Sequence, residues 1–205
     1  MTISLIGIII SGLFIQPKTL LCFIPLALIT LAYSVPVLKV KGKKKRLREI
    51  FLVKITTLAL VWSFTTVTLP MIDNGIDLFT KSSVALFIQR FLFMFAICIP
   101  FEIRDMEQEK KWSNTTLPIY IGVKGSKLIG LLSLLIFIIL VYLQFGKSLD
   151  EMNNNFALPL YCSAVAASLL IIFSSQHRSK YYCRIFVDGT MQLQFILLLL
   201  FSTFR

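Results

Sequence analysis

The sequence predicts an all-α membrane protein, a polytopic helix bundle with about seven transmembrane helices that forms one domain over residues 1–205. Hydrophobic residues make up 57% of the chain and charged residues only 15%, whereas soluble domains carry about 25% charged residues. The apolar residues are gathered into runs of membrane-crossing length with short polar breaks between them. Because no segment shows sustained alternation of polar and apolar residues, we do not expect a membrane β-barrel.

Seven apolar segments follow one another, and each is expected to be a helix because lipid offers no hydrogen-bond partners to an open backbone. Most have 16 to 20 residues, close to the roughly 20 that cross a bilayer. They are residues 3–15, 19–35, 50–69, 83–101, 127–145, 156–174 and 187–204. The first is short, about 20 Å of helix, and lacks the basic start and cleavage site of a signal peptide. It is typical of a helix whose beginning is missing, so we expect an N-terminal truncation.

The distribution of Lys and Arg predicts the orientation of these helices. The second, fourth and sixth loops carry fifteen basic residues, seven of them within residues 39–48, and the other three loops carry one each. Loops rich in Lys and Arg stay in the cytoplasm, so the even-numbered loops are expected there. The short loops are typical of a prokaryotic inner (cell) membrane.

The net charge of +11 is compatible with nucleic acid, an anionic membrane surface or an anionic substrate. Nucleic-acid binding is not expected, because no loop is long enough to fold a module of basic and aromatic residues. The basic residues 41–48 set topology and attract anionic lipid, which explains most of them. The four cysteines show no metal-binding spacing, and most lie in apolar runs, so they are read as small buried hydrophobes.

An acidic cluster directly follows the fourth apolar segment, in the stretch EIRDMEQEKKW at 102–112. On a helix, Glu102, Asp105 and Glu109 share one face about 60° wide, whereas Glu107 and Arg104 point elsewhere. Like charges on adjacent turns repel, so a cation is expected to compensate them. Mg²⁺ prefers oxygen ligands and often joins carboxylates to substrate phosphates. The pattern therefore suggests a Mg²⁺–diphosphate site, with an ordinary interfacial loop of mixed charge as the alternative.

The longer stretch EIRDMEQEKKWSNTTLPIYIG at 102–122 resembles the second aspartate-rich motif of the UbiA family of intramembrane prenyltransferases. In that motif three spaced acids precede a short basic stretch, then Thr-Leu-Pro and a glycine. The acids match Glu102, Asp105 and Glu109, with Glu in place of Asp at two of them, and the rest matches Thr116, Leu117, Pro118 and Gly122.

Two further stretches resemble parts of the same family in the expected order. The stretch LAYSVPVLKVKGKKK at 31–45 is similar to a cytoplasmic loop whose tyrosine and lysines lie near the diphosphate, here Tyr33, Lys39 and Lys41. The stretch FVDGTMQLQ at 186–194 is similar to the start of the family's last helix and contains Asp188.

The resemblance implies a UbiA-like bundle, with Mg²⁺ as cofactor and an isoprenoid diphosphate donor whose prenyl group passes to a hydrophobic, aromatic or lipidic acceptor. It implies metal ligation by Glu102, Asp105 and Glu109. Diphosphate contacts are expected from Tyr33, Lys39, Lys41 and Lys110, with Arg90 as a weaker candidate and Asp188 as a further site residue. The family's first acidic motif and first two helices have no counterpart, since no Asp or Glu precedes Glu49.

Two cations within apolar segments need separate interpretations. Arg90 lies mid-segment, where a charge is functional by default; a diphosphate, a carboxylate or a backbone carbonyl could be its partner. Lys54 lies near a helix end and is expected to extend toward lipid headgroups.

Three function classes stay open at this stage. The first is a Mg²⁺-dependent prenyltransferase, the second a catalytically inactive UbiA-like membrane protein, and the third a small transporter. Transporters place polar groups at the midplane, whereas most charges here lie at a membrane interface, so the first class is favoured.

Overall fold

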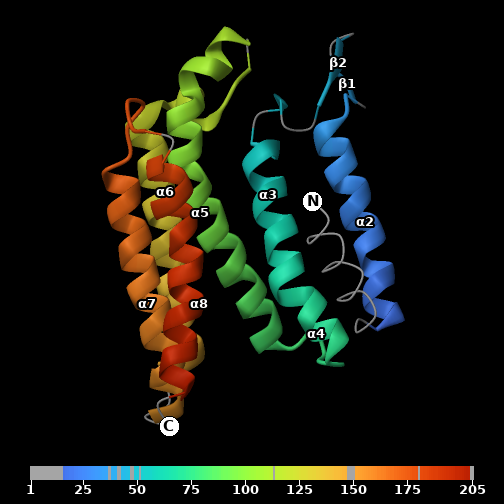
Figure 1. Ribbon diagram of the computed structural model, residues 1–205, viewed down its shortest axis with the longest axis vertical. Helices are drawn as coiled ribbons and strands as arrows, with labels where there is room; N and C mark the ends of the chain where they lie inside the picture. The colour runs from blue at the N-terminus through green and yellow to red at the C-terminus, as the bar shows by residue number, and fades with distance from the viewer. Residues whose placement is uncertain are drawn as a thin grey trace.

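The computed structural model describes residues 16–36, 38–40, 43–46, 49–50, 52–112, 114–146, 151–179 and 181–203. It is a helical protein with one short β-hairpin (Figure 1). The elements in chain order are α2 (Pro17–Ser34), β1 (Leu38–Val40), β2 (Lys43–Lys45), α3 (Val53–Ser63), η2 (Phe64–Thr68), α4 (Leu69–Asp73), α5 (Lys81–Lys111), α6 (Leu117–Phe145), α7 (Glu151–Ile172), η3 (Tyr182–Val187) and α8 (Asp188–Thr203). The two η elements are π-helical turns that join directly to the α-helices beside them.

Six of the seven predicted apolar segments are helical, and the first, residues 3–15, lies outside the described residues. Four helices in the described part are long and apolar enough to cross a membrane: Pro17–Ser34, Val53–Asp73, Lys81–Lys111 and Leu117–Phe145. Two further apolar helices, Phe156–Ile172 and Ile185–Phe201, are shorter. The helical membrane character is therefore supported, and a count of seven transmembrane helices stays a prediction.

The helical placement of the acidic stretch is confirmed, because residues 102–109 lie within α5. The expected segment boundaries at 101 and 127 are wrong, because α5 ends only at Lys111 and α6 already begins at Leu117. Helix α5 begins at the N-cap Thr80, whose side chain accepts a hydrogen bond from the Ser83 amide, and it runs ten residues past the apolar segment. Lys110 and Lys111 lie in its last turn, where cations interact favourably with the helix dipole. Helix α6 starts at Leu117-Pro118, and proline suits the first turn because it needs no backbone donor there.

Two short strands in the basic loop are a second departure from the all-α prediction. β1 and β2 pair antiparallel, with Leu38 opposite Lys45. A short alternation of apolar and basic residues at 38–41, followed by Gly42, is a weak strand-and-turn signal that the sequence analysis did not use, and the hairpin is only three residue pairs long.

Helix α5 is the centre of the packing and contacts α3, α6 and α7. Its buried face contributes Phe93 and Ile97 to a core with Phe137 of α6 and Ile171 of α7. In Figure 1, α5 crosses the molecule diagonally, with α6, α7 and α8 on one side and α2, α3 and α4 on the other. Leucine and isoleucine side chains are widely exposed on the outer helices, as expected of surfaces that meet lipid.

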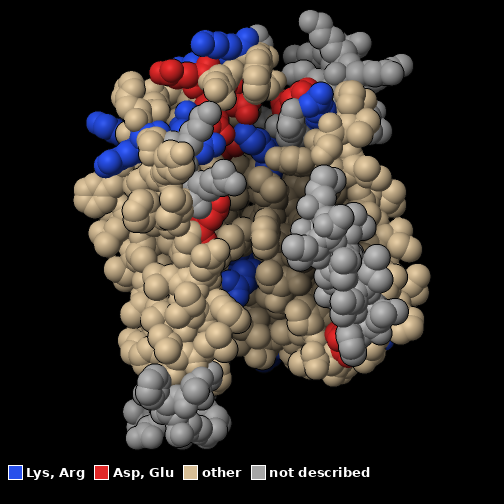
Figure 2. Space-filling model, viewed as in Figure 1, with Lys and Arg blue, Asp and Glu red and all other residues tan. Residues whose placement is uncertain are grey.

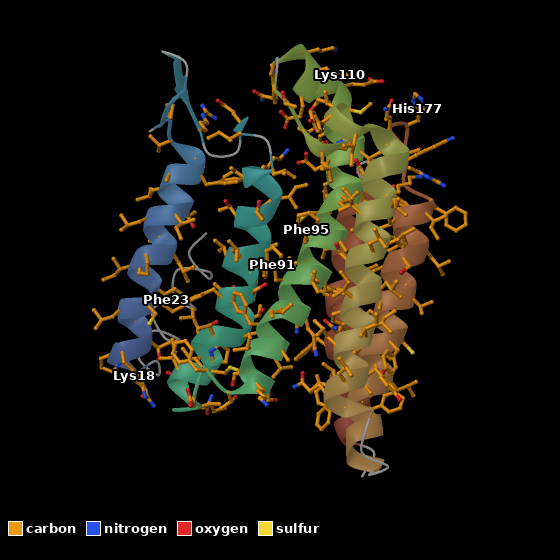
Figure 3. The ribbon with its side chains drawn as sticks, turned by 180° about the vertical axis from the view of Figure 1, so that it is seen from behind. Lys18, Phe23, Phe91, Phe95, Lys110 and His177 are labelled. Carbon is orange, nitrogen blue, oxygen red and sulfur yellow. The ribbon has the colours of Figure 1, made fainter. Side chains whose placement is uncertain are left out.

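The described loops divide between the two ends of the bundle. The β-hairpin, the α5–α6 junction and the α7–η3 loop lie at one end, and the α4–α5 turn lies at the other (Figure 1). Figure 3 places Lys110 and His177 at the first end and Lys18 at the opposite one. The even-numbered loops therefore share one end of the molecule, and its cytoplasmic location remains a proposal.

Candidate functional site

A cavity of about 1040 Å³ lies between α3, α5 and α8. Figure 2 looks onto it: the surface recedes between the helices, and charged atoms lie within a tan surround. Helix α3 and the π-helical turn after it contribute a side chain every fourth residue: Lys54, Leu58, Trp62 and Thr66. The stripe on α5 has helical spacing as well and comprises Arg90, Met94, Ile97, Phe101 and Asp105.

Helix α8 closes the cavity with a third stripe. It consists of Asp188, Met191, Gln192, Phe195 and Ile196, and this spacing is that of one helix face. Because α3 and α8 run antiparallel to α5 (Figure 1), Lys54, Asp188 and the acidic end of α5 meet at one end of the cavity. The middle is apolar.

Lys54 is the cation that compensates the acidic face of α5. Its Nζ atom lies 2.8 Å from Glu102 Oε1 and 2.9 Å from Glu109 Oε1, and the two carboxylates are 5% and 12% exposed. The expectation that Lys54 extends toward lipid headgroups is therefore wrong. A cation inside the bundle is favoured here because two like charges about two turns apart on one helix face are buried together.

Asp105 is held by its neighbour in the chain. Arg104 donates from Nε to Asp105 Oδ1 at 2.7 Å and from an Nη atom to Oδ2 at 3.0 Å, and its guanidinium lies over the Phe101 ring at 5.3 Å. The helical wheel had pointed Arg104 away from the acids, but the long side chain reaches back to the adjacent residue. Glu107 is exposed, as its angular position predicted.

The oxygen donors at this end suit Mg²⁺ only in part. Glu102, Asp105 and Asp188 all line the cavity, and carboxylate oxygens are the ligands that Mg²⁺ prefers. Within the described residues, however, no three acidic, cysteine or histidine side chains come close enough to hold a metal by themselves. The donor set therefore fits an ion bound by one or two carboxylates together with ligand phosphate oxygens and water, which is a common arrangement for Mg²⁺.

Asn114, which lies just before the Thr-Leu-Pro stretch, is a second partner of Glu109. Asn114 Nδ2 donates to Glu109 Oε2 at 2.9 Å, and the Asn114 amide donates to the Glu109 carbonyl at 3.0 Å. No sequence pattern predicted this pairing of Asn114 with Glu109. Thr116 is buried at the N-cap of α6, and its hydroxyl finds no hydrogen-bond partner in the described structure.

Some of the residues expected to contact a diphosphate do not line this cavity. Tyr33 lies near the end of α2, and Lys110 is exposed in the last turn of α5 (Figure 3). The side chain of Lys39 and all of Lys41 lie outside what the structure describes.

Arg90 does line the cavity, but far from the acidic end. It is twelve residues before Glu102 on α5, which corresponds to about 18 Å along the helix axis. Its Nη1 atom donates to Gln194 Oε1 of α8 at 2.5 Å. The sequence analysis missed Gln194, Thr66 and Trp62. The helical spacing of Trp62 and Thr66 relative to Lys54 was visible in the sequence, but not which helix faces meet, and Gln194 lies on a different face of α8 from Asp188.

Comparisons of the chain with models of known protein families, with curated proteins and with solved structures found no match.

Proposed function

We propose that this chain binds an isoprenoid diphosphate in the cavity between α3, α5 and α8 and, with Mg²⁺, transfers its prenyl group to a hydrophobic acceptor within the membrane. The observation that carries the proposal is the shape and polarity of the cavity. One end gathers Lys54, Glu102, Asp105 and Asp188, and a long apolar section follows. A ligand with a charged head and an isoprenoid tail matches this division.

The residues of the chain have distinct roles in this proposal. Asp105 and Asp188 line the cavity and would hold Mg²⁺ together with oxygens of the diphosphate. When bound there, the ion neutralises the negative charge that develops on the leaving diphosphate. Lys54 keeps Glu102 and Glu109 charge-balanced and adds positive charge at the head-group end.

The apolar section has its own function. Leu58, Trp62, Met94 and Ile97 line it and would surround the isoprenoid tail. Their side chains exclude water from the reacting carbon, which matters because an allylic cation is readily hydrolysed. The acceptor would reach this carbon from the bilayer.

Isoprenoid-diphosphate binding to the purified protein in detergent tests the proposal, with and without Mg²⁺. Farnesyl diphosphate is the probe, and farnesol, which lacks the diphosphate, is the matched ligand control. We expect Mg²⁺ to strengthen farnesyl diphosphate binding and to leave farnesol unchanged. Asp105→Asn should reduce the Mg²⁺ effect by about tenfold or more, since changes outside the metal's own ligands already have effects of that size.

Glu107→Gln is the control variant, because Glu107 lies on the same helix but is exposed. It should bind as the unmodified protein does. Equal binding of both probes, or a Mg²⁺ effect that persists in Asp105→Asn, would contradict the assignment.

A second candidate function is ligand binding without catalysis by a UbiA-like membrane protein. The ion pairs favour it, because Glu102, Glu109 and Asp105 already have cationic partners in this structure. It predicts farnesyl diphosphate binding that is independent of Mg²⁺ and no prenyl transfer in membranes.

A further inference from the structure

We propose that the end of the cavity remote from the acidic residues is a second binding subsite, in which Arg90 holds the carboxylate of a membrane-soluble monoanion such as a long-chain fatty acid. The inference concerns Arg90, Gln194 and the apolar section beside them. It goes beyond the proposed prenyl transfer and does not depend on a diphosphate binding at the other end.

The position of Arg90 is the first observation. It lies nine residues into α5, within a helix long and apolar enough to cross a membrane. Its side chain lines both the large cavity and a neighbouring cavity of about 160 Å³. Ionisable residues at such depth are rare and mark ligand or ion sites.

The partners of Arg90 are the second observation. In the described structure its guanidinium makes one hydrogen bond, to the side-chain oxygen of Gln194, and takes part in no ion pair. Gln194 is only 2% exposed, so this neutral amide is fixed in the core and orients the guanidinium. A guanidinium has five N–H donors and does not lose its proton in proteins, so among the described residues most of its donors and its charge have no partner.

The single positive charge of Arg90 favours a ligand with one negative charge. One guanidinium is neutralised by one negative charge, whereas a diphosphate would leave several charges unpaired in an apolar surround. Two parallel N–H donors match the two oxygens of a carboxylate. Trp62 and Thr66 line the same cavity on the α3 side. The Trp62 indole carries an N–H donor, and the Thr66 hydroxyl donates to the Trp62 carbonyl at 2.7 Å.

The surroundings decide the body of the ligand. Met94, Ile97 and Trp62 line the cavity next to Arg90, so the chain attached to the carboxylate must be apolar. Trp62, Phe195 and Ile196 line the cavity and are 43%, 63% and 51% exposed. These apolar side chains form a rim toward the outside of the bundle, by which an amphiphile in the bilayer can enter sideways.

The distance separates this subsite from the acidic end. Arg90 and Glu102 are twelve residues apart on α5, about 18 Å along the axis. Lys54 and Thr66 are spaced by the same number of residues on the facing helix. The two polar ends of the cavity are therefore too far apart to bind one compact head group.

Retention of radiolabelled palmitate by the purified full chain tests the proposal, with hexadecanol of the same chain length as the uncharged comparison. After removal of free probe by gel filtration in detergent, we expect palmitate to be retained and hexadecanol to be lost. Arg90→Gln should reduce palmitate retention by about tenfold or more, since hydrogen bonds to charged groups have effects of that size. Arg90→Lys keeps the charge but not the paired N–H donors, so its palmitate retention should lie between that of the unmodified protein and that of Arg90→Gln.

Arg178→Gln is the matched control, because this arginine lies in the α7–η3 loop and should leave retention unchanged. Equal retention of the two probes, or unchanged palmitate retention in Arg90→Gln, would overturn the proposal. Retention is not expected to depend on Mg²⁺, so the outcome is independent of the test of diphosphate binding.

A spectroscopic measurement on the unmodified protein covers the case in which Arg90→Gln does not fold. Palmitate labelled with ¹³C at its carboxyl carbon is followed by NMR as the pH is lowered. A carboxylate paired with a guanidinium stays ionised to lower pH than one in a micelle. The bound signal should therefore titrate below that of micellar palmitate, and identical titration of the two signals would overturn the proposal.

Discussion

Lys54 Nζ lies 2.8 Å from Glu102 Oε1, and the same atom is 2.9 Å from Glu109 Oε1, so one cation on α3 joins two turns of α5. Removing that cation would leave two buried carboxylates without a counter-ion. We expect Lys54→Met to destabilise the protein by about 3–5 kcal/mol, the usual cost of breaking a buried ion pair by removing one partner. Unfolding of the detergent-solubilised protein by increasing sodium dodecyl sulfate measures the change.

Lys111→Met is the control for this substitution, because Lys111 is exposed in the last turn of α5 and should change stability little. Adding Glu102→Gln to Lys54→Met should recover part of the loss, since one unpaired charge is then removed. Strictly additive losses in the double variant would show that the pair is not coupled.

The Thr116 hydroxyl has no hydrogen-bond partner in the described structure, which predicts that its removal does not lower the stability of the protein. The Oγ1 atom is buried, and an unsatisfied buried group costs about 1–3 kcal/mol. Thr116→Val should therefore leave the free energy of unfolding unchanged or raise it. Thr80→Val is the contrasting variant, because the Thr80 hydroxyl caps α5 and its loss should cost about 1 kcal/mol. A similar loss in both variants would mean that Thr116 has a partner, such as a bound ligand.

Side-chain hydrogen bonds join the beginning of α5 to the end of α6, at the end of the bundle opposite the acidic residues. Gln89 Nε2 donates to Gln144 Oε1 at 2.8 Å, and Gln144 Nε2 donates to Ser82 Oγ at 2.9 Å. A double-mutant cycle of Gln89→Leu and Gln144→Leu should give a coupling of about 0.6 kcal/mol and not above about 1.7, as for other hydrogen bonds between membrane helices. Gln108, which is exposed on α5, replaces Gln89 in the control cycle, where the coupling should vanish.

Gly122 has a backbone conformation that other residues adopt only with strain. Its φ and ψ are 80° and 165°, and it interrupts the start of α6. We expect Gly122→Ala to cost about 1–3 kcal/mol through backbone strain. A steric clash is not the cause, since a Cβ atom there would meet nothing within 4 Å. Gly189→Ala is the matched control, because space is equally open there and no positive φ is involved. It should be neutral or slightly stabilising, and equal effects of the two variants would argue against strain at Gly122.

The shared end of the even-numbered loops predicts which side chains a membrane-impermeant thiol reagent can reach. In a background with Cys22, Cys98, Cys162 and Cys183 replaced, Lys18→Cys should be labelled in intact cells and Lys110→Cys only after the cytoplasmic side is opened. The reason is the excess of basic residues at the Lys110 end. Labelling in the reverse pattern would place that end outside.

The sequence predicted the helices better than the contacts between them. Apolar runs marked six helices because burial in lipid leaves a strong compositional trace. The helix ends were predicted less well: the apolar segment stops at residue 101, whereas α5 continues through charged residues to Lys111, because hydropathy alone does not mark a charged continuation of a helix. Capping by Thr80 and the proline at the start of α6 were local signals that could have corrected them.

For the candidate site, helical periodicity predicted that Glu102 and Glu109 share a face, since this depends on one helix alone. It could not predict Lys54 as their partner, because that pairing depends on how α3 packs against α5. The hydrogen bond between Arg90 and Gln194 could not be predicted for the same reason, because the two residues are 104 positions apart and no local pattern indicates their contact. The roles given to the acids by the family resemblance stay predictions.

The exposed apolar rim formed by Trp62, Phe195 and Ile196 also affects how ligand affinity should be expressed. A ligand that reaches the cavity through this rim comes from the bilayer or micelle, so its effective concentration is a mole fraction in that phase. Diluting such a ligand with inert lipid at constant total molarity should lower occupancy, whereas adding water should not. Apparent dissociation constants for this protein are therefore comparable only at a fixed ratio of ligand to detergent or lipid.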